Sequence, residues 1–378
     1  MQAARHHAPI RQLRGAGRLA IAATHGLTEL VEALHRGVTR APAGSGITGL
    51  VYRSVRGITH LVGGGIDIAL QGLEPWLTAP EPDSPAVPGT EALLAILNGV
   101  LGDYLAATDN PLAIPMQLRR QGRALTAAPQ DAGPRPLLLI HGLCMNDLQW
   151  QRGNLAEGLE ALGYTPLHLH YNSGLHISDN GRQLARLLER LLQQWPVPLQ
   201  DLSLLGHSMG GLLARSAVHH AQAEGLQWPR RLRHLVSLGS PHLGAPLEQG
   251  GQQLQLLLGL SAYARPLIAL TRRRSAGIQD LRWASLREQD WGQRRSLPLP
   301  AGVDCYAIAA TTAGNPAGLP ARLLGDGLVP VASALGRHRE AARRLDFPPD
   351  HQWVLAGAGH LALQTHPAVL TKLREWLG

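Results

Sequence analysis

The sequence is poor in cysteine, lysine and aromatic residues. Its two cysteines, Cys144 and Cys305, cannot build a disulfide framework; we expect two buried free thiols, with one bridge between them as the alternative. Because neither the cysteine nor the histidine spacing forms a ligand set, no metal is expected. Aromatic residues make up 4% of the chain and the basic residues form no reading motif, so nucleic-acid binding is disfavoured.

Long apolar runs are also missing. No stretch reaches the roughly 18 apolar residues that mark a membrane-spanning helix. The N-terminal stretch is positively charged, but Thr24 and His25 break its apolar part, so a secretory signal is not expected. We therefore expect a cytoplasmic protein, with peripheral contact to a membrane as an open alternative.

Charged residues make up 16% of the chain and hydrophobic residues 44%, a composition that predicts a folded protein with a full core. The formal net charge is +8, which favours anionic partners such as a phospholipid surface. Lys372 is the only lysine, so arginine supplies nearly all of the positive charge. Codon usage explains an arginine bias equally well, and the charge alone does not identify a partner.

Residues 1–130 are predicted to form a helical N-terminal region. Apolar residues recur with helical spacing over 27–38 and 47–62, and a third helix is expected over 90–107 with Thr90 as its N-cap. We expect these amphipathic helices to pack on each other or on the rest of the chain. Binding to a membrane surface is the alternative.

Residues 131–378 follow a different pattern. Six apolar runs, from LLLIHG to QWVLAGAG, alternate with helical segments. This alternation predicts parallel strands joined by crossover helices, and the near-continuous apolarity of the runs predicts a sheet covered on both faces. The expected fold class is therefore α/β with a mainly parallel sheet.

The stretch GHSMG, residues 206–210, joins an apolar run to a helical segment. In this strand-turn-helix setting a tight turn exposes a serine hydroxyl, and the flanking glycines leave room for the turn. Ser208 is therefore the candidate nucleophile. The N–H of Met209 at the helix start and the N–H of Leu143 after an earlier strand are the candidate donors of an oxyanion hole.

A serine nucleophile needs a histidine to accept its proton and a carboxylate to orient that histidine. Asp326 lies between glycines after the fifth apolar run, and His360 lies in a glycine-rich loop after the last one. The chain order of serine, acid and histidine is the one expected for such an elbow. Three other acids fit less well, because they begin a strand or lie close to the last one: Asp304, Asp346 and Asp350.

Taken together, the motifs HGLCMND, GHSMGG, GSPHLGAP, GDGLVP and GAGH resemble those of the α/β-hydrolase superfamily. They occur in the order used by bacterial lipases and by lipase-like proteins related to the GPI-inositol deacylases. The resemblance covers about residues 135–378. It implies Ser208 as nucleophile, Asp326 as acid, His360 as base, and Leu143 and Met209 as oxyanion donors. It also implies ester hydrolysis without a cofactor.

Residues 246–299 interrupt the alternation at the place where lipases usually insert a cap. An amphipathic cap of this kind would cover an acyl pocket and open at a lipid surface, exposing the leucines of 256–260. The arginines at 272–274 would then suit an anionic headgroup, and a solvated charge cluster is the alternative.

The stretches LHYNSGLHISDNG and LNGVLGDYLAATDNPLAIPM are similar to those of a group of uncharacterised bacterial hydrolases with the same helical N-terminal part. This similarity implies no particular function. Tyr171, Asn172 and His176 follow a predicted strand end, so we expect them to line a substrate pocket. A loop that only caps the sheet is the alternative.

Two classes of function follow from these residues. The first is a serine carboxylester hydrolase that acts on a lipid-like or hydrophobic acyl ester through an acyl-Ser208 intermediate; a thioesterase, amidase or acyltransferase would use the same triad. The second is a catalytically silent hydrolase fold that binds a membrane surface or a partner.

Overall fold

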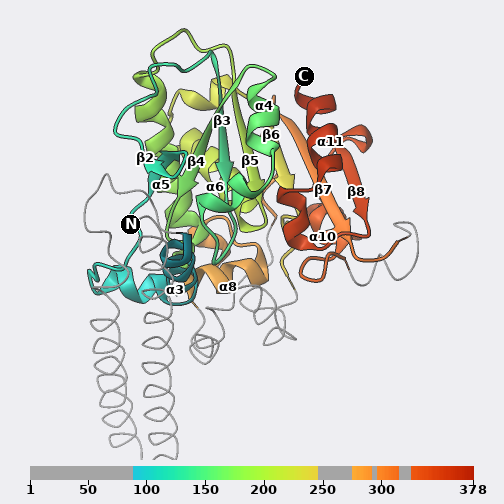
Figure 1. The fold of residues 1–378 in the computed structure, drawn as a ribbon. Coiled ribbons are helices and arrows are strands. Elements are labelled where there is room, and N and C mark those ends of the chain that lie inside the picture. Colours follow the sequence, from blue (N-terminus) through green and yellow to red (C-terminus); the bar gives the residue numbers. More distant parts are fainter. Residues whose placement is uncertain (1–87, 246–274, 292–295, 315–324) are drawn as a thin grey trace, which may run out of the picture.

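The computed structural model describes residues 88–245, 275–291, 296–314 and 325–378. These residues form one eight-stranded sheet in the order β2-β1-β4-β3-β5-β6-β7-β8 (Figure 1). β1 runs antiparallel to β2 and β4, and the other neighbours are parallel. The strands are β1 (Gln117–Arg120), β2 (Arg123–Ala124), β3 (Arg135–Ile140), β4 (Tyr164–His170), β5 (Leu202–His207), β6 (Leu232–Leu238), β7 (Asp304–Thr311) and β8 (Gln352–Ala356).

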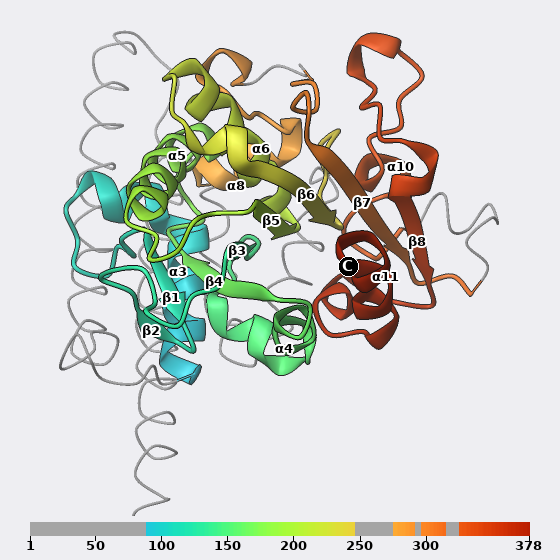
Figure 2. The same cartoon turned by 90° about the horizontal axis from the view of Figure 1, so that it is seen from above.

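Helices cover both faces of this sheet. Seen from above, α5 and α6 lie on one side of the strands, and α4 and α11 lie on the other (Figure 2). The α-helices are α3 (Pro88–Ala107), α4 (Leu155–Glu160), α5 (Ile177–Gln193), α6 (Met209–Ala223), α8 (Ala276–Trp283), α10 (Val331–Ala334) and α11 (Pro367–Leu377). Two short 3₁₀ helices near the site are η1 (Asp147–Arg152) and η8 (His360–Gln364).

The central strands are buried because both faces of the sheet carry an apolar core. Leu138 and Ile140 of β3 belong to the core under α5 and α6, whereas Leu137 and Leu139 belong to the core under α4 and α11. Every residue of β4 and β5 is buried. The six predicted apolar runs correspond to β3 through β8, so the prediction of a mainly parallel, doubly covered sheet is confirmed.

The sheet also includes two strands that the sequence did not reveal. β1 and β2 lie in the part of the chain that we assigned to the helical N-terminal region, and β1 pairs with β4. Their residues are mostly polar, QLRR and RA, so no apolar run marks them. The sheet therefore begins before residue 131.

Helix α3 is the predicted third helix, but it begins at Pro88, so Thr90 lies inside it and is not its N-cap. It contributes Ile96, Leu97 and other apolar side chains to the core under α5 and α6. α3 and α8 lie close together at one end of the sheet (Figure 1). The N-terminal helix is thus part of the same folded body as the sheet.

Several predictions concern residues that the structure does not describe. The helices expected over 27–38 and 47–62 lie outside the described residues, and so do 246–274 and 292–295 of the cap expected over 246–299. The described part of that cap contains α8. No helix among the described residues combines the length and apolar character that a membrane crossing requires.

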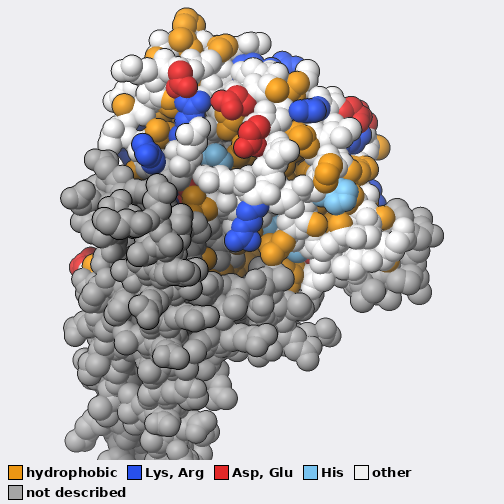
Figure 3. All heavy atoms as spheres, viewed as in Figure 1, with side chains coloured by type: hydrophobic (Ala, Val, Ile, Leu, Met, Phe, Trp, Pro, Cys, Tyr) orange, Lys and Arg blue, Asp and Glu red, His pale blue; other side chains and the backbone are white. Residues whose placement is uncertain are grey.

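On the face seen in Figure 3, acidic and basic side chains of the described residues are interspersed, so the net positive charge is not gathered in one patch of that face.

Cys144 and Cys305 are both free and buried, as predicted.

Candidate active site

Ser208 occupies the sharp turn between β5 and α6. Its φ of 54° and ψ of −122° fall in a backbone region that residues other than glycine rarely adopt. The Ser208 N–H donates to the Leu238 carbonyl over 2.8 Å, which ties the turn to the end of β6. A strained backbone that the neighbouring strand and helix hold in place is typical of a functional position.

The two glycines of the motif allow this turn because backbone segments approach each other closely there. A β-carbon on Gly206 would lie 2.3 Å from the backbone carbon of Gly210, and one on Gly210 would lie 2.3 Å from the carbonyl oxygen of Ile140. Either distance is far below van der Waals contact. The spacing of glycines around Ser208 therefore follows from packing α6 against β5 and β3.

Asp326 is held by three hydrogen bonds in the turn that precedes α10. Its Oδ1 accepts from the backbone N–H groups of Leu328 (3.0 Å) and Val329 (2.8 Å), and its Oδ2 lies 2.7 Å from His360 Nδ1. The carboxylate is fully buried. Since an ionised carboxylate only accepts, it places the imidazole proton on Nδ1 and leaves the lone pair on Nε2.

His360 presents that Nε2 atom as an unpaired group: it is buried and has no hydrogen-bond partner among the described residues. The ring packs over the end of β6, since a β-carbon on Gly239 would lie 3.2 Å from His360 Nδ1. Gly239 directly follows Leu238, whose carbonyl holds the Ser208 turn. His360 and Ser208 therefore both contact the end of β6. A hydrogen bond between a nucleophile and its base often forms fully only when a substrate binds.

The loop after β3 packs directly against Ser208. A β-carbon on Gly142 would lie 2.9 Å from the Ser208 β-carbon. Leu143 follows in this loop, and Met209 is the first residue of α6, where helix N–H groups have no intrahelical partner. Neither of these two N–H groups donates to a backbone carbonyl in the loops that the structure describes.

The three predicted pocket residues all have partners within the protein. The Tyr171 hydroxyl donates to the His141 carbonyl over 2.9 Å, and the Asn172 amide donates to the Gly102 carbonyl of α3 over 2.9 Å. His176 Nδ1 lies 3.1 Å from Asp280 Oδ2, and its ring stacks on Trp291. Asn172 and His176 thus join the loop after β4 to α3 and α8, and their role as pocket residues stays a prediction.

His207 has a contact that the sequence did not indicate. Its Nε2–H donates to the His360 carbonyl oxygen over 3.0 Å, and the two rings lie 4.6 Å apart. Burial and the neighbouring His360 keep the pKa of His207 well below its ordinary value, so the ring is neutral and donates through one nitrogen. A residue beside the nucleophile therefore also fixes the backbone of the candidate base.

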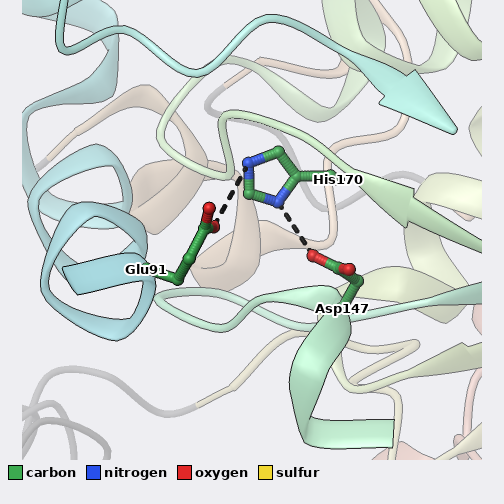
Figure 4. A group of neighbouring side chains, drawn as sticks. All are labelled: Glu91, Asp147 and His170. Carbon is green, nitrogen blue, oxygen red and sulfur yellow. Dashed lines mark hydrogen bonds and ion pairs between the residues drawn. The ribbon is translucent and has the colours of Figure 1, made fainter. Parts of the chain in front are cut away.

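Glu91, Asp147 and His170 form a cluster whose ligand atoms lie within 4.8 Å of one another (Figure 4). The two nitrogens of His170 face different carboxylates, with Nδ1 3.1 Å from Asp147 and Nε2 3.8 Å from Glu91. Arg119 Nη1 already lies 3.1 Å from Glu91 and 3.2 Å from Asp147. Because a guanidinium occupies the space between the carboxylates, the cluster is an ion-pair network that does not fit a metal ion.

Comparison with known proteins agrees with this fold. Residues 131–288 match the family model described as PGAP1-like alpha/beta domain. No curated protein matches the chain at a significant level.

Three solved structures illustrate the similarity. The mature form of a Bacillus licheniformis lipase is 16% identical, with 70% of this chain and 98% of that chain covered and a TM-score of 0.45. The NocB thioesterase domain, in covalent complex with a fluorophosphonate nocardicin G analogue, is 16% identical over 70% of this chain and 99% of that one, with a TM-score of 0.41. A Pyrococcus furiosus esterase is 14% identical over 66% of this chain and 84% of that one, with a TM-score of 0.39. Residues 131–288 are thus similar to the PGAP1-like alpha/beta domain, and the mainly parallel sheet with helices on both faces has the α/β-hydrolase fold.

Proposed function

We propose that this protein is a serine hydrolase that cleaves carboxylesters with a lipid-like or hydrophobic acyl group. The observation that carries the proposal is the buried Asp326–His360 pair, 2.7 Å apart, with an unpaired Nε2 on a ring that packs at the end of β6, to which the strained Ser208 turn is also bonded. A nucleophile, a base and an orienting acid are the groups that acyl transfer requires.

In the proposed reaction, Ser208 Oγ bonds to the ester carbonyl carbon while His360 Nε2 takes the hydroxyl proton. Asp326 stabilises the imidazolium, and the N–H groups of Leu143 and Met209 donate to the oxyanion. Collapse of this intermediate breaks the ester C–O bond, and His360 returns the proton to the leaving alcohol. Water then attacks the acyl-Ser208 carbonyl by the same route, which releases the acid and restores the serine.

The apolar insertion supports a hydrophobic acyl group, because residues 254–260 read LQLLLGL at the place of the expected cap. The proposal extends to peripheral contact with an anionic membrane, which the net charge of +8 would favour. A thioesterase, amidase or acyltransferase would use the same groups and differ in pocket shape and acceptor access.

Two measurements on the purified protein test the proposal. Fluorophosphonate should label the wild type and the Ser45→Ala control but not Ser208→Ala, since covalent labelling needs an activated serine. Hydrolysis of p-nitrophenyl esters from acetyl to palmitoyl should increase with chain length and with anionic phospholipid vesicles, and should depend on Ser208.

The outcomes separate the candidates. Absence of labelling and of hydrolysis at every chain length would overturn the proposal in favour of a silent fold. Activity confined to short acyl chains and indifferent to vesicles would keep the serine chemistry and reject the lipid substrate.

A further inference from the structure

The loop that carries Leu143 ends at Asp147, the first residue of η1. The Asp147 side chain is fully buried, and its Oδ1 lies 3.1 Å from His170 Nδ1 and 3.2 Å from Arg119 Nη1. These two basic groups come from β4 and β1, which belong to the sheet. The far end of the loop is therefore fixed by charge-assisted contacts in a region shielded from water.

Glu91 of α3 contacts the same two basic groups from the other side. Its Oε2 lies 3.1 Å from Arg119 Nη1 and 3.8 Å from His170 Nε2. Figure 4 shows the His170 ring between Glu91, which projects from α3, and Asp147. Glu91 therefore restricts the orientation of both groups that hold Asp147.

Helix α3 touches the loop a second time, next to Leu143. A β-carbon on Gly99 would lie 2.3 Å from the Cys144 sulfur, so the helix backbone packs directly on this side chain. Cys144 has a left-handed φ of 57°, and its N–H donates to the Ser173 hydroxyl over 3.1 Å. The segment that follows Leu143 is thus held at Cys144 and at Asp147.

We infer that Glu91 is a positioning residue for the oxyanion hole: through Arg119 and His170 it holds Asp147, and with it the loop that presents the Leu143 N–H to the substrate oxyanion. The inference rests on the proposed function. A hydrogen-bond donor stabilises an oxyanion only when it is held close to the productive geometry, and a displacement of about 1 Å can cost on the order of 100-fold in rate. In this view α3, which precedes the matched α/β domain, completes the catalytic machinery of that domain.

The test compares Glu91→Ala and Glu91→Gln with Glu160→Ala. Glu160 is a matched control, because it contacts the neighbouring Arg120 of β1 on a solvent-exposed surface, 3.4 Å away. With the best p-nitrophenyl ester, kcat of Glu91→Ala should fall about 10-fold with KM within twofold, since oxyanion contacts act mainly in the transition state. The fluorophosphonate labelling rate should fall in parallel. Glu91→Gln keeps an acceptor for Arg119 and should recover part of the loss, and Glu160→Ala should match the wild type.

Three results would overturn the inference: unchanged kcat and labelling in both folded Glu91 variants, a rise in KM alone, or an equal loss in Glu160→Ala. If the alanine variant does not fold, the glutamine variant decides. Amide hydrogen exchange over 142–147 provides a readout that needs no activity, and it should be faster in Glu91→Gln. A wild type that neither labels nor turns over would refute the proposed function, whereas an active wild type with normal exchange and kcat in Glu91→Gln would refute only the role of Glu91.

Discussion

At the scale of single residues, the candidate site depends on which atom donates and which accepts in the hydrogen bond between Asp326 and His360. Asp326 accepts from two backbone N–H groups and from His360, so its carboxylate has no freedom to turn. In Asp326→Asn, the amide oxygen can still accept from the backbone, which places the NH₂ group against His360 Nδ1. That contact favours the tautomer with the proton on Nε2, and such a histidine cannot accept the serine proton.

We therefore expect Asp326→Asn to remain folded and to lose activity by about 10⁴-fold, the size of effect that a wrong tautomer produces in serine hydrolases. Steady-state ester hydrolysis measures the loss, and thermal unfolding checks the fold. Asp346→Asn is the matched control, because Asp346 is an exposed acid that pairs with Arg344. Comparable activity in the two variants would remove Asp326 from the proposed triad.

At the scale of elements, one hydroxyl group joins α3 and α8. Ser275 is the N-cap of α8: its hydroxyl oxygen accepts from the Ile278 N–H over 3.4 Å, and its O–H donates to the Gly99 carbonyl of α3 over 2.7 Å. The side chain is fully buried, so water does not replace these contacts when they are lost. The cap thus stabilises both the start of α8 and its packing on α3.

Replacing Ser275 by alanine should lower the free energy of unfolding by about 1 kcal/mol, as for other N-cap serines, with an added loss from the contact to α3. Urea unfolding measures this difference. Ser237→Ala removes another buried hydroxyl, one without a hydrogen-bond partner among the described residues, and should change stability by less than about 0.5 kcal/mol. Equal effects of the two substitutions would show that the cap contributes nothing specific.

At the scale of the whole molecule, buried histidines couple stability to pH. Burial lowers the pKa of His141 to about 3, and burial, aided by a neighbouring basic group, lowers the pKa of His207 and His242 well below the ordinary value. The unfolded chain binds these protons below about pH 6.5, whereas the folded chain does not. Their stabilising contribution is therefore complete above pH 6.5 and is lost as the pH falls towards the folded-state pKa values. His176 opposes this trend: burial lowers its pKa, but the hydrogen bond to Asp280 and the charges of the nearby carboxylates together outweigh burial and raise it.

We expect the free energy of unfolding to decrease between pH 7 and pH 5, because each of the three histidines costs about 1.4 kcal/mol per pH unit well below 6.5. Urea unfolding at pH 7.5, 6 and 5 measures the slope. His242→Asn keeps an acceptor for Arg215 and should make the slope shallower by up to about 1.4 kcal/mol per pH unit, the contribution of one histidine. A stability that stays constant or increases towards pH 5 would contradict the prediction.

Sequence patterns with a local cause were sufficient to predict most of this fold. The apolar runs that became β3 through β7 are mostly buried, and such strands need no long-range information to be recognised. Ser208 was identifiable because its turn requires glycines at fixed offsets. β1 and β2 escaped prediction because short strands of polar residues carry no periodic signal, and β1 forms only because β4 offers it a pairing partner.

The sequence by itself determined the α/β sheet, the position of the elbow at Ser208 and the candidates Asp326 and His360, because strand burial, turn geometry and chain order are properties of short segments. Only the tertiary structure decided that His207 binds the carbonyl of a residue 153 positions away, and that Glu91 of α3 meets His170 and Arg119 beside Asp147. The physical reason is that a buried polar group must be satisfied by whichever partner the fold brings near. That partner is set by the packing of the sheet and its helices, and no spacing in the sequence records it.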